Sequence, residues 1–400
     1  MENFIVSARK YRPSTFRSVV GQQHITSTLQ NAILNNQLAH AFLFCGPRGV
    51  GKTTCARLLA EAINCTNLSA EGEPCHECES CRSFDNGTSM NIFELDAASN
   101  NSVEDIRSLV EQMRVPPQTG RYKVYIIDEV HMLSISAFNA LLKSLEEPPS
   151  FVKFILATTE KHKVIPTILS RCQVFDFHRI QATDIANHLA YVAQSEGIQA
   201  EPEALNVIAQ KAEGGLRDAL STFDQMANFT SRNITYKEVI SNLNILDADY
   251  FFRIIDYARR ADLANTLLCY EEIVNKGFDG QHFITGLTKH IRNLLVSLDP
   301  STLCLLDTSD STRQRYGEQA VTCGVQLLMR YLNIAADFEY RYREANNKRL
   351  FVEVALTKLV AQTTPAAPAA APPSTAAPKP TGTASAPGSD PAAAQNHRLS

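Results

Sequence analysis

The chain has 400 residues, enough for two or three domains at about 150 residues each. Its formal net charge of −4 excludes a protein that coats nucleic acid through a uniformly basic surface. No stretch approaches the roughly 18 apolar residues of a membrane span, and MENFIVSARKYRPSTF does not follow the charge order of a secretory signal. The ten Cys are too few for a disulfide scaffold, so we expect a cytoplasmic protein that contacts no membrane.

Short apolar runs alternate with helical patterns between residues 41 and 177, which is typical of a parallel sheet with crossover helices. The runs are AFLFC, IFEL, VYII, KFILA and VFDF. Two helices are predicted from apolar stripes, one formed by Ala56, Leu59, Ala60 and Ile63 and the other by Phe138, Leu141, Leu142 and Leu145. The fold class is therefore α/β, with a core domain expected over residues 1–179.

Strand signals fade after residue 179. Thr183 is expected to cap a helix, Pro202 to start another and Gly214-Gly215 to end it. This pattern predicts a small helical domain over 180–243 and a second all-α domain over 244–361. Residues 362–400 are rich in Pro and Ala and poor in large apolar side chains, so a disordered linker is predicted there.

A phosphate-binding loop is predicted at Gly46-Pro47-Arg48-Gly49-Val50-Gly51-Lys52-Thr53, which matches G-x-x-x-x-G-K-[ST] between a predicted strand and a predicted helix. The glycines let backbone N–H groups surround the phosphates of ATP, and Lys52 adds a positive charge. The Thr53 hydroxyl can ligate Mg²⁺.

Further polar residues follow two other predicted strands. Asp128 and Glu129 end VYII, and at the carboxyl edge of a parallel sheet they would face the same crevice as the phosphate loop. We expect Asp128 to hold the metal through water and Glu129 to polarise the attacking water. Thr158 and Thr159 end FILA, where a hydroxyl could hold that water near the γ-phosphate.

Two arginines are candidates for contacts with phosphate. Arg171 ends a short helical stretch in LSRC, and Arg217 begins a helix in GLRD. A guanidinium is always charged and can present two donors to phosphate oxygens.

Cys65, Cys75, Cys78 and Cys81 form C-x9-C-x2-C-x2-C after the predicted phosphate-loop helix. Four thiolates suit tetrahedral Zn²⁺, and without an open position such a site would be structural. An iron–sulfur cluster is the alternative, because C-x2-C-x2-C also occurs in proteins that bind clusters. His76 is a spare candidate ligand. The other Cys are interpreted as ordinary core residues: Cys45, Cys55, Cys172, Cys269, Cys304 and Cys323.

Taken together, residues 8–360 resemble the AAA+ ATPases of bacterial DNA polymerase III clamp loaders. The resemblance rests on ARKYRPSTFRSVVGQ, GPRGVGKTTCARLLAEAINC, the four-Cys insertion, ELDAASN, YKVYIIDEVHMLS, FNALLKSLEEPP, FILATTE, ILSRCQ and GGLRDALS, in this order. It implies an ATPase core, a helical lid and a helical collar that assembles subunits into an open ring. The family opens a sliding clamp with ATP and closes it around primed DNA.

The resemblance also implies roles for single residues. Thr159, or alternatively Thr158, would sense the γ-phosphate, Arg217 would be the sensor of the lid, and Arg171 would act as an arginine finger in the neighbouring subunit. The stretch from Val19 to Gln22 would lie against the adenine. The implied nucleotide-binding set is Val19, Val20, Gly21, Gly46, Pro47, Arg48, Gly49, Val50, Gly51, Lys52, Thr53, Thr54 and Arg217.

Partners implied by the resemblance are other clamp-loader subunits, the sliding clamp, primed DNA and a single-strand-binding protein, and no polymerase active site is expected in this chain. The loop formed by Ser99, Asn100, Asn101 and Ser102 is neutral, whereas relatives often carry a basic residue there. Contact with DNA phosphate at this loop would therefore rest on backbone N–H groups and hydroxyls. The tail resembles the start of a linker in longer relatives.

Two other classes of function compete with this interpretation. A ring subunit that binds without hydrolysing ATP would have no reason to hold Lys52, Thr53, Asp128 and Glu129 together. Another phosphate-loop enzyme, such as a helicase motor or a nucleotide kinase, is disfavoured by the four-Cys insertion and by the SRC motif around Arg171.

Overall fold

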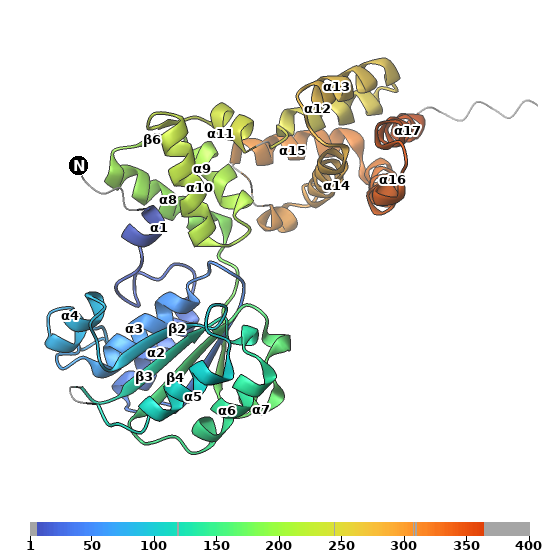
Figure 1. Cartoon of the computed structure of the whole chain (residues 1–400). Helices are drawn as coiled ribbons and strands as arrows, with labels where there is room; N and C mark the ends of the chain where they lie inside the picture. Colours follow the sequence, from blue (N-terminus) through green and yellow to red (C-terminus); the bar gives the residue numbers. More distant parts are fainter. Residues whose placement is uncertain (1–5, 118–119, 244, 307, 309, 364–400) are drawn as a thin grey trace, which may run out of the picture. The chain divides into compact units, whose positions relative to one another are not determined.

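The computed structural model describes residues 6–117, 120–243, 245–306, 308 and 310–363 (Figure 1). The segment 364–400, which holds most of the predicted linker, lies outside the described residues. None of the helices in the described ranges is long and apolar enough to cross a membrane.

A parallel five-stranded sheet forms the first part of the chain. Its strands are β1 (Ala41–Cys45), β2 (Ile92–Asp96), β3 (Lys123–Asp128), β4 (Val152–Thr158) and β5 (Gln173–Asp176), in the order β2-β3-β4-β1-β5. The central strands β1 and β4 are buried along their whole length, as expected for a parallel sheet covered on both faces. This sheet confirms the predicted α/β class.

Alternate residues of the strands enter two hydrophobic clusters, one on each face of the sheet. Phe42, Phe44 and Ile126 pack with α2 (Gln23–Leu34) and α3 (Lys52–Asn64). On the other face, Leu43, Tyr125 and Leu156 pack with α5 (Val103–Gln112), α6 (Ile135–Glu146) and α7 (Pro166–Leu169). The helices in Figure 1 accordingly flank the sheet.

Shorter elements complete this part of the chain. The helix α1 (Ser7–Lys10) precedes α2, and α4 (Glu79–Asp85) follows α3 and contains the last Cys of the insertion. The 3-10 turns η1 (Val130–Met132) and η2 (Lys161–Lys163) follow β3 and β4. Both turns therefore lie at the carboxyl edge of the sheet, next to the predicted polar residues.

The rest of the described chain is mainly helical and holds two further hydrophobic clusters. One joins α8 (Ala182–Glu196), α9 (Pro202–Lys211), α10 (Leu216–Phe229) and α11 (Tyr236–Asn242), with a short parallel pair β6 (Gln199–Ala200) and β7 (Asn233–Ile234). The other joins α12 (Ala248–Arg259), α13 (Leu263–Asn275), α14 (Gly280–Val296), α15 (Asp310–Cys323), α16 (Val325–Arg341) and α17 (Lys348–Ala361). The 3-10 helices η3 (Pro300–Leu305) and η4 (Tyr342–Glu344) lie between members of this second group.

Two local expectations were wrong. Thr183 does not cap α8, because the N-cap is Gln181 in an extended conformation and Thr183 already lies in the first turn. The helix that Pro202 begins ends at Lys211, before Gly214, and Gly215 instead becomes the N-cap of α10.

Candidate active site and metal centre

The predicted phosphate loop joins the end of β1 to the start of α3. Gly46, Gly49 and Gly51 have φ values of 148°, 77° and 103°, which side chains with a Cβ rarely adopt. A Cβ at Gly46 would lie 2.5 Å from the carbonyl oxygen of Phe177, so the loop also needs glycine there for space. The sequence thus folds into a loop that ends at the N-terminus of a 13-residue helix, where backbone N–H groups and the helix dipole favour an anion.

Lys52 is 6% exposed, and its Nζ donates to the carbonyl oxygens of Gly46 and Pro47, both over 2.7 Å. Burial lowers the pKa of Lys52, while the negative charges of Glu129 and Asp128 act in the opposite direction. The loop therefore holds a buried cation on its own backbone carbonyls, next to two carboxylates.

Thr53 and Asp128 meet at the carboxyl edge of the sheet. The Thr53 hydroxyl donates to Oδ2 of Asp128 over 2.6 Å, and the backbone N–H of Glu129 donates to Oδ1 of Asp128 over 2.9 Å. The hydroxyl and the carboxylate are hard oxygen donors of the kind that Mg²⁺ takes from protein while it keeps several waters. Their side chains fit a magnesium site.

Glu129 adopts a left-handed backbone conformation with φ 48° between β3 and η1. Its Oε2 accepts hydrogen bonds from the backbone N–H of Thr159 over 3.1 Å and from the Thr159 hydroxyl over 2.9 Å. The Nδ1 of His131 lies 3.3 Å from the same oxygen. The structure thus links the carboxylate that follows β3 to the hydroxyl that follows β4.

Thr158 is fully buried and has different partners from Thr159. Its hydroxyl accepts from the backbone N–H of Glu160 over 3.0 Å and lies 3.0 Å from Nδ1 of His131. These contacts hold the Thr158 side chain within the fold. Of the two threonines, Thr159 is the one that contacts Glu129. His131 was missed at the sequence level, because nothing in YKVYIIDEVHMLS distinguishes it from an ordinary histidine.

The start of α10 approaches the phosphate loop. The backbone N–H of Arg217 donates to the carbonyl oxygen of Gly49 over 3.4 Å, and a Cβ at Gly49 would lie 3.2 Å from Cα of Gly215.

Burial lowers the pKa of Arg12, and the positive charges of Arg57 and Arg217 also lower it. Arg12 is thus a further cation of this region that the sequence did not single out.

The Val19–Gln22 stretch lies beside the same loop. Val19 is buried, and its Cγ1 is 3.8 Å from the position that a Cβ on Gly51 would take. Nε2 of Gln22 donates to the carbonyl oxygen of His178 over 2.7 Å and to that of Val50 over 3.5 Å. At Gly21, with φ 71°, a Cβ would approach Ile180 to 2.9 Å. The remaining predicted loop residues, Val20, Arg48 and Thr54, are half-buried or exposed.

Arg171 lies after α7 and is not brought to the phosphate loop of its own chain by any described contact. Its guanidinium donates to Oε1 of Glu146 over 2.6 Å and to the carbonyl oxygen of Thr167 over 2.8 Å. This contact could not be predicted from the sequence, because Glu146 ends α6 whereas Arg171 follows α7, 25 residues later.

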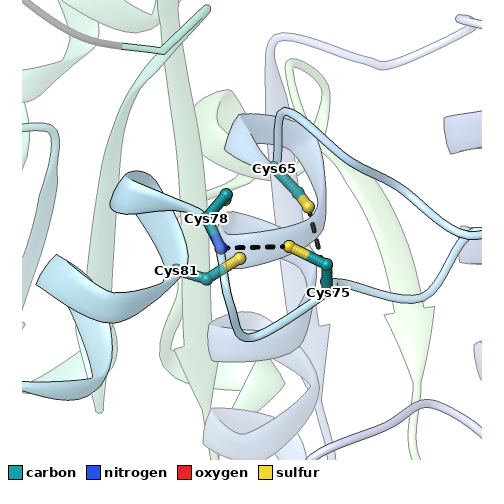
Figure 2. A group of neighbouring side chains, drawn as sticks. All are labelled: Cys65, Cys75, Cys78 and Cys81. Carbon is teal, nitrogen blue, oxygen red and sulfur yellow. Dashed lines mark hydrogen bonds between the residues drawn. The ribbon is translucent and has the colours of Figure 1, made fainter.

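The four predicted metal ligands converge (Figure 2). The sulfur atoms of Cys65, Cys75, Cys78 and Cys81 all lie within 4.8 Å of one another. Burial acts to raise the pKa of the Cys78 thiol, but hydrogen bonds involving Thr66 and Cys81 outweigh it and lower this pKa to about 6. Four converging thiols fit a tetrahedral Zn²⁺. His76 does not share this cluster but lies with Glu61 and Asp85, with its Nδ1 2.8 Å from Oε1 of Glu61.

Comparison with known proteins places the chain in a family. Residues 21–181 match the model described as DNA polymerase III, delta subunit, and residues 184–232 match the ATPase lid domain of the DNA polymerase III clamp loader subunit. DNA polymerase III subunit gamma of Buchnera aphidicola subsp. Baizongia pistaciae is 39% identical over 320 residues, which cover 80% of this chain and 86% of that protein. The chain belongs to the DNA polymerase III gamma/tau family.

Two tau relatives of the family are longer than this chain. The tau subunit of Bacillus subtilis is 39% identical over 88% of this chain, and the match covers 62% of that protein. The tau subunit of Escherichia coli is 41% identical over 75% of this chain, and the match covers 47% of that protein. The chain thus spans between about half and three fifths of these tau relatives.

Proposed function

We propose that this chain is the ATP-hydrolysing subunit of a bacterial clamp loader, which opens a sliding clamp and closes it around primed DNA. The observation that carries the proposal is the 2.6 Å hydrogen bond from the Thr53 hydroxyl to Asp128, next to the buried Lys52. Membership in the gamma/tau family supports the same activity. The proposed partners are other clamp-loader subunits in a ring, the sliding clamp, primed DNA and a single-strand-binding protein, all in the cytoplasm.

The proposed roles are supported by the geometry of the site and by the family resemblance. The N–H groups of Gly49 and Gly51 and the Lys52 cation bind the phosphates, and Val19, Val20 and Gly21 lie against the adenine. Thr53, and Asp128 through water, would hold Mg²⁺, which would neutralise phosphate charge. Glu129 takes a proton from the attacking water, and Thr159 orients Glu129 and senses the γ-phosphate.

Arg217 is proposed as the sensor of the lid, because the start of α10 already contacts Gly49. Arg171 is proposed to act in the site of a neighbouring subunit, which requires it to leave Glu146. The proposed division of the chain is an ATPase core over 1–179, a lid over 180–243, a collar over 244–361 and a linker over 362–400. The four Cys are proposed to bind one structural Zn²⁺.

The test is the steady-state rate of ATP hydrolysis by the chain assembled with its companion subunits. We expect the rate to rise when the sliding clamp and primed DNA are added together, and to rise less with either alone. Binding of ATP without hydrolysis under all these conditions would instead identify a ring subunit that does not hydrolyse ATP. Hydrolysis that ignores both clamp and primed DNA would contradict the clamp-loading function.

A further inference from the structure

A turn inside the four-Cys insertion faces the N-terminal segment of the chain. The backbone N–H of Gly72 donates to the carbonyl oxygen of Ser69, and that of Ser69 donates to the carbonyl oxygen of Glu73, both over 3.0 Å. Gly72 has φ 80°, which closes the turn without strain. Glu73 therefore has a fixed backbone position, two residues before the first Cys of the C-x2-C-x2-C group.

The Glu73 carboxylate accepts three hydrogen bonds from two other segments. Its Oε2 accepts from the backbone N–H of Phe16 over 2.7 Å. Its Oε1 accepts from the backbone N–H of Arg17 over 3.0 Å and from Nε2 of Gln30 on α2 over 3.1 Å. Hydrogen bonds to an ionised acceptor are shorter and stronger than neutral ones, so this carboxylate is a specific tie between the insertion and residues 16–17.

A second contact joins the insertion to the same segment. Nε2 of His76 lies 2.9 Å from the carbonyl oxygen of Ser14. His76 itself stands between Cys75 and Cys78 in the chain, with Nδ1 at 2.8 Å from Glu61. The insertion therefore holds the N-terminal segment at Ser14 and at Phe16 to Arg17.

The segment held in this way leads directly to the proposed adenine contacts. Phe16 is 1% exposed and shares one hydrophobic cluster with Val19 and Val50. Gln22, at the end of the stretch, bonds to the carbonyl oxygen of Val50 in the phosphate loop. Movement of Phe16 and Arg17 would therefore displace a wall of the proposed nucleotide site.

We propose that Glu73 is a positioning residue for the nucleotide, through which the folded four-Cys insertion raises the affinity of the chain for ATP. This proposal rests on the proposed function, because it takes Val19 to Gln22 as the residues against the adenine. Glu73 does not touch the nucleotide. It fixes the backbone N–H groups of Phe16 and Arg17, and they fix the stretch that follows.

The test compares Glu73→Gln with Glu71→Gln, an exposed glutamate in the same turn whose side chain makes none of the described hydrogen bonds to residues 14–17. The dissociation constant of a fluorescent ATP analogue is measured for both variants and for the parent chain. Glu73→Gln should weaken binding about tenfold, within the usual range of coupling between two sites. Glu71→Gln should bind as the parent does. Equal affinity of all three chains would overturn the proposal.

Hydrogen exchange gives a local readout that a general loss of stability would not reproduce. Peptides covering residues 13–22 should exchange faster in Glu73→Gln than in the parent chain, while peptides from the sheet should not change. Unchanged exchange at residues 13–22 would overturn the proposed tie, because the N–H groups of Phe16 and Arg17 would then be held by something else.

Two further variants show which part of the proposal is wrong if a result is negative. Lys52→Ala is measured in the same binding assay: if it binds normally, the proposed nucleotide site is wrong, and if it alone loses binding, only the role of Glu73 is wrong. Should Glu73→Gln fail to fold, Glu73→Asp keeps the charge but shortens the side chain. It must then show both faster exchange at residues 13–22 and weaker binding, and normal values of both would overturn the proposal.

Discussion

Thr159 donates two hydrogen bonds to one oxygen of Glu129, from its backbone N–H over 3.1 Å and from its hydroxyl over 2.9 Å. The residues follow different strands, β3 and β4, which are neighbours in the sheet. The proposed general base is therefore oriented by the residue proposed to sense the γ-phosphate. A change in the position of Thr159 would move the Glu129 carboxylate with it.

Thr159→Val tests this relationship, because it removes the hydroxyl bond and keeps the shape of the side chain and the backbone N–H. We expect the rate of hydrolysis to fall by about tenfold or more, as when a catalytic base loses its orientation. ATP affinity and melting temperature should stay near those of the parent. Thr158→Val, which removes a buried hydroxyl bonded to Glu160, should instead lower the melting temperature. The reverse pattern would assign the sensor to Thr158.

Glu129→Gln should bind ATP and fail to hydrolyse it. The amide keeps an oxygen that can accept from Thr159 but cannot take a proton, so the rate should fall by about 100-fold or more. The measurement is single-turnover hydrolysis with the clamp and primed DNA present. Glu111→Gln, which alters an exposed glutamate of α5, is the control and should hydrolyse ATP at the parent rate. If Glu129→Gln hydrolysed ATP as fast as the control, Glu129 would not be the general base.

Elemental analysis of the purified chain should find one zinc atom per chain and no iron. Cys81→Ser should lose the zinc and lower the melting temperature, because Cys81 is the buried member of the four-thiol group. Cys172→Ser, outside that group, should keep the zinc. Iron in the parent chain would favour the cluster alternative, and zinc retained in full by Cys81→Ser would contradict the proposed ligand set.

Arg171→Ala should bind ATP normally but lose most of the hydrolysis that the clamp and primed DNA stimulate, by about 10³-fold for an arginine finger. Mixed rings give the sharper result. A Lys52→Ala chain, whose own site is inactive, still carries Arg171 and should restore hydrolysis in neighbouring Arg171→Ala chains. Mixed rings that assemble but are no more active than either variant alone would show that Arg171 does not act across the interface.

Much of the sheet could be predicted from the sequence, because buried parallel strands form continuous apolar runs. Four of the five predicted runs lie within β1 to β4, and VFDF extends one residue past the end of β5 at Asp176. The pair β6 and β7 was not predicted, since strands of two residues leave no periodicity. The start of α8 was misplaced at Thr183 because Gln181, which lacks the usual side chain of an N-cap, holds that position.

The phosphate loop and the four Cys could be predicted because each follows a short local pattern. The contacts between distant segments could not. Glu73 bonds to Phe16 across 57 residues, and Arg171 bonds to Glu146 across 25. Such bonds depend on how the folded segments meet, and no spacing rule in a single sequence reports them.

The central claim is that the loop ending in Lys52 binds ATP, and calorimetric titration of ATP with Mg²⁺ into Lys52→Ala tests it most directly. Lys52→Ala should give no measurable binding while it melts as the parent does, because the buried cation of the loop is gone. The control is Lys143→Ala on the exposed side of α6, which should bind as the parent does. Undiminished ATP binding by a folded Lys52→Ala chain would contradict the account.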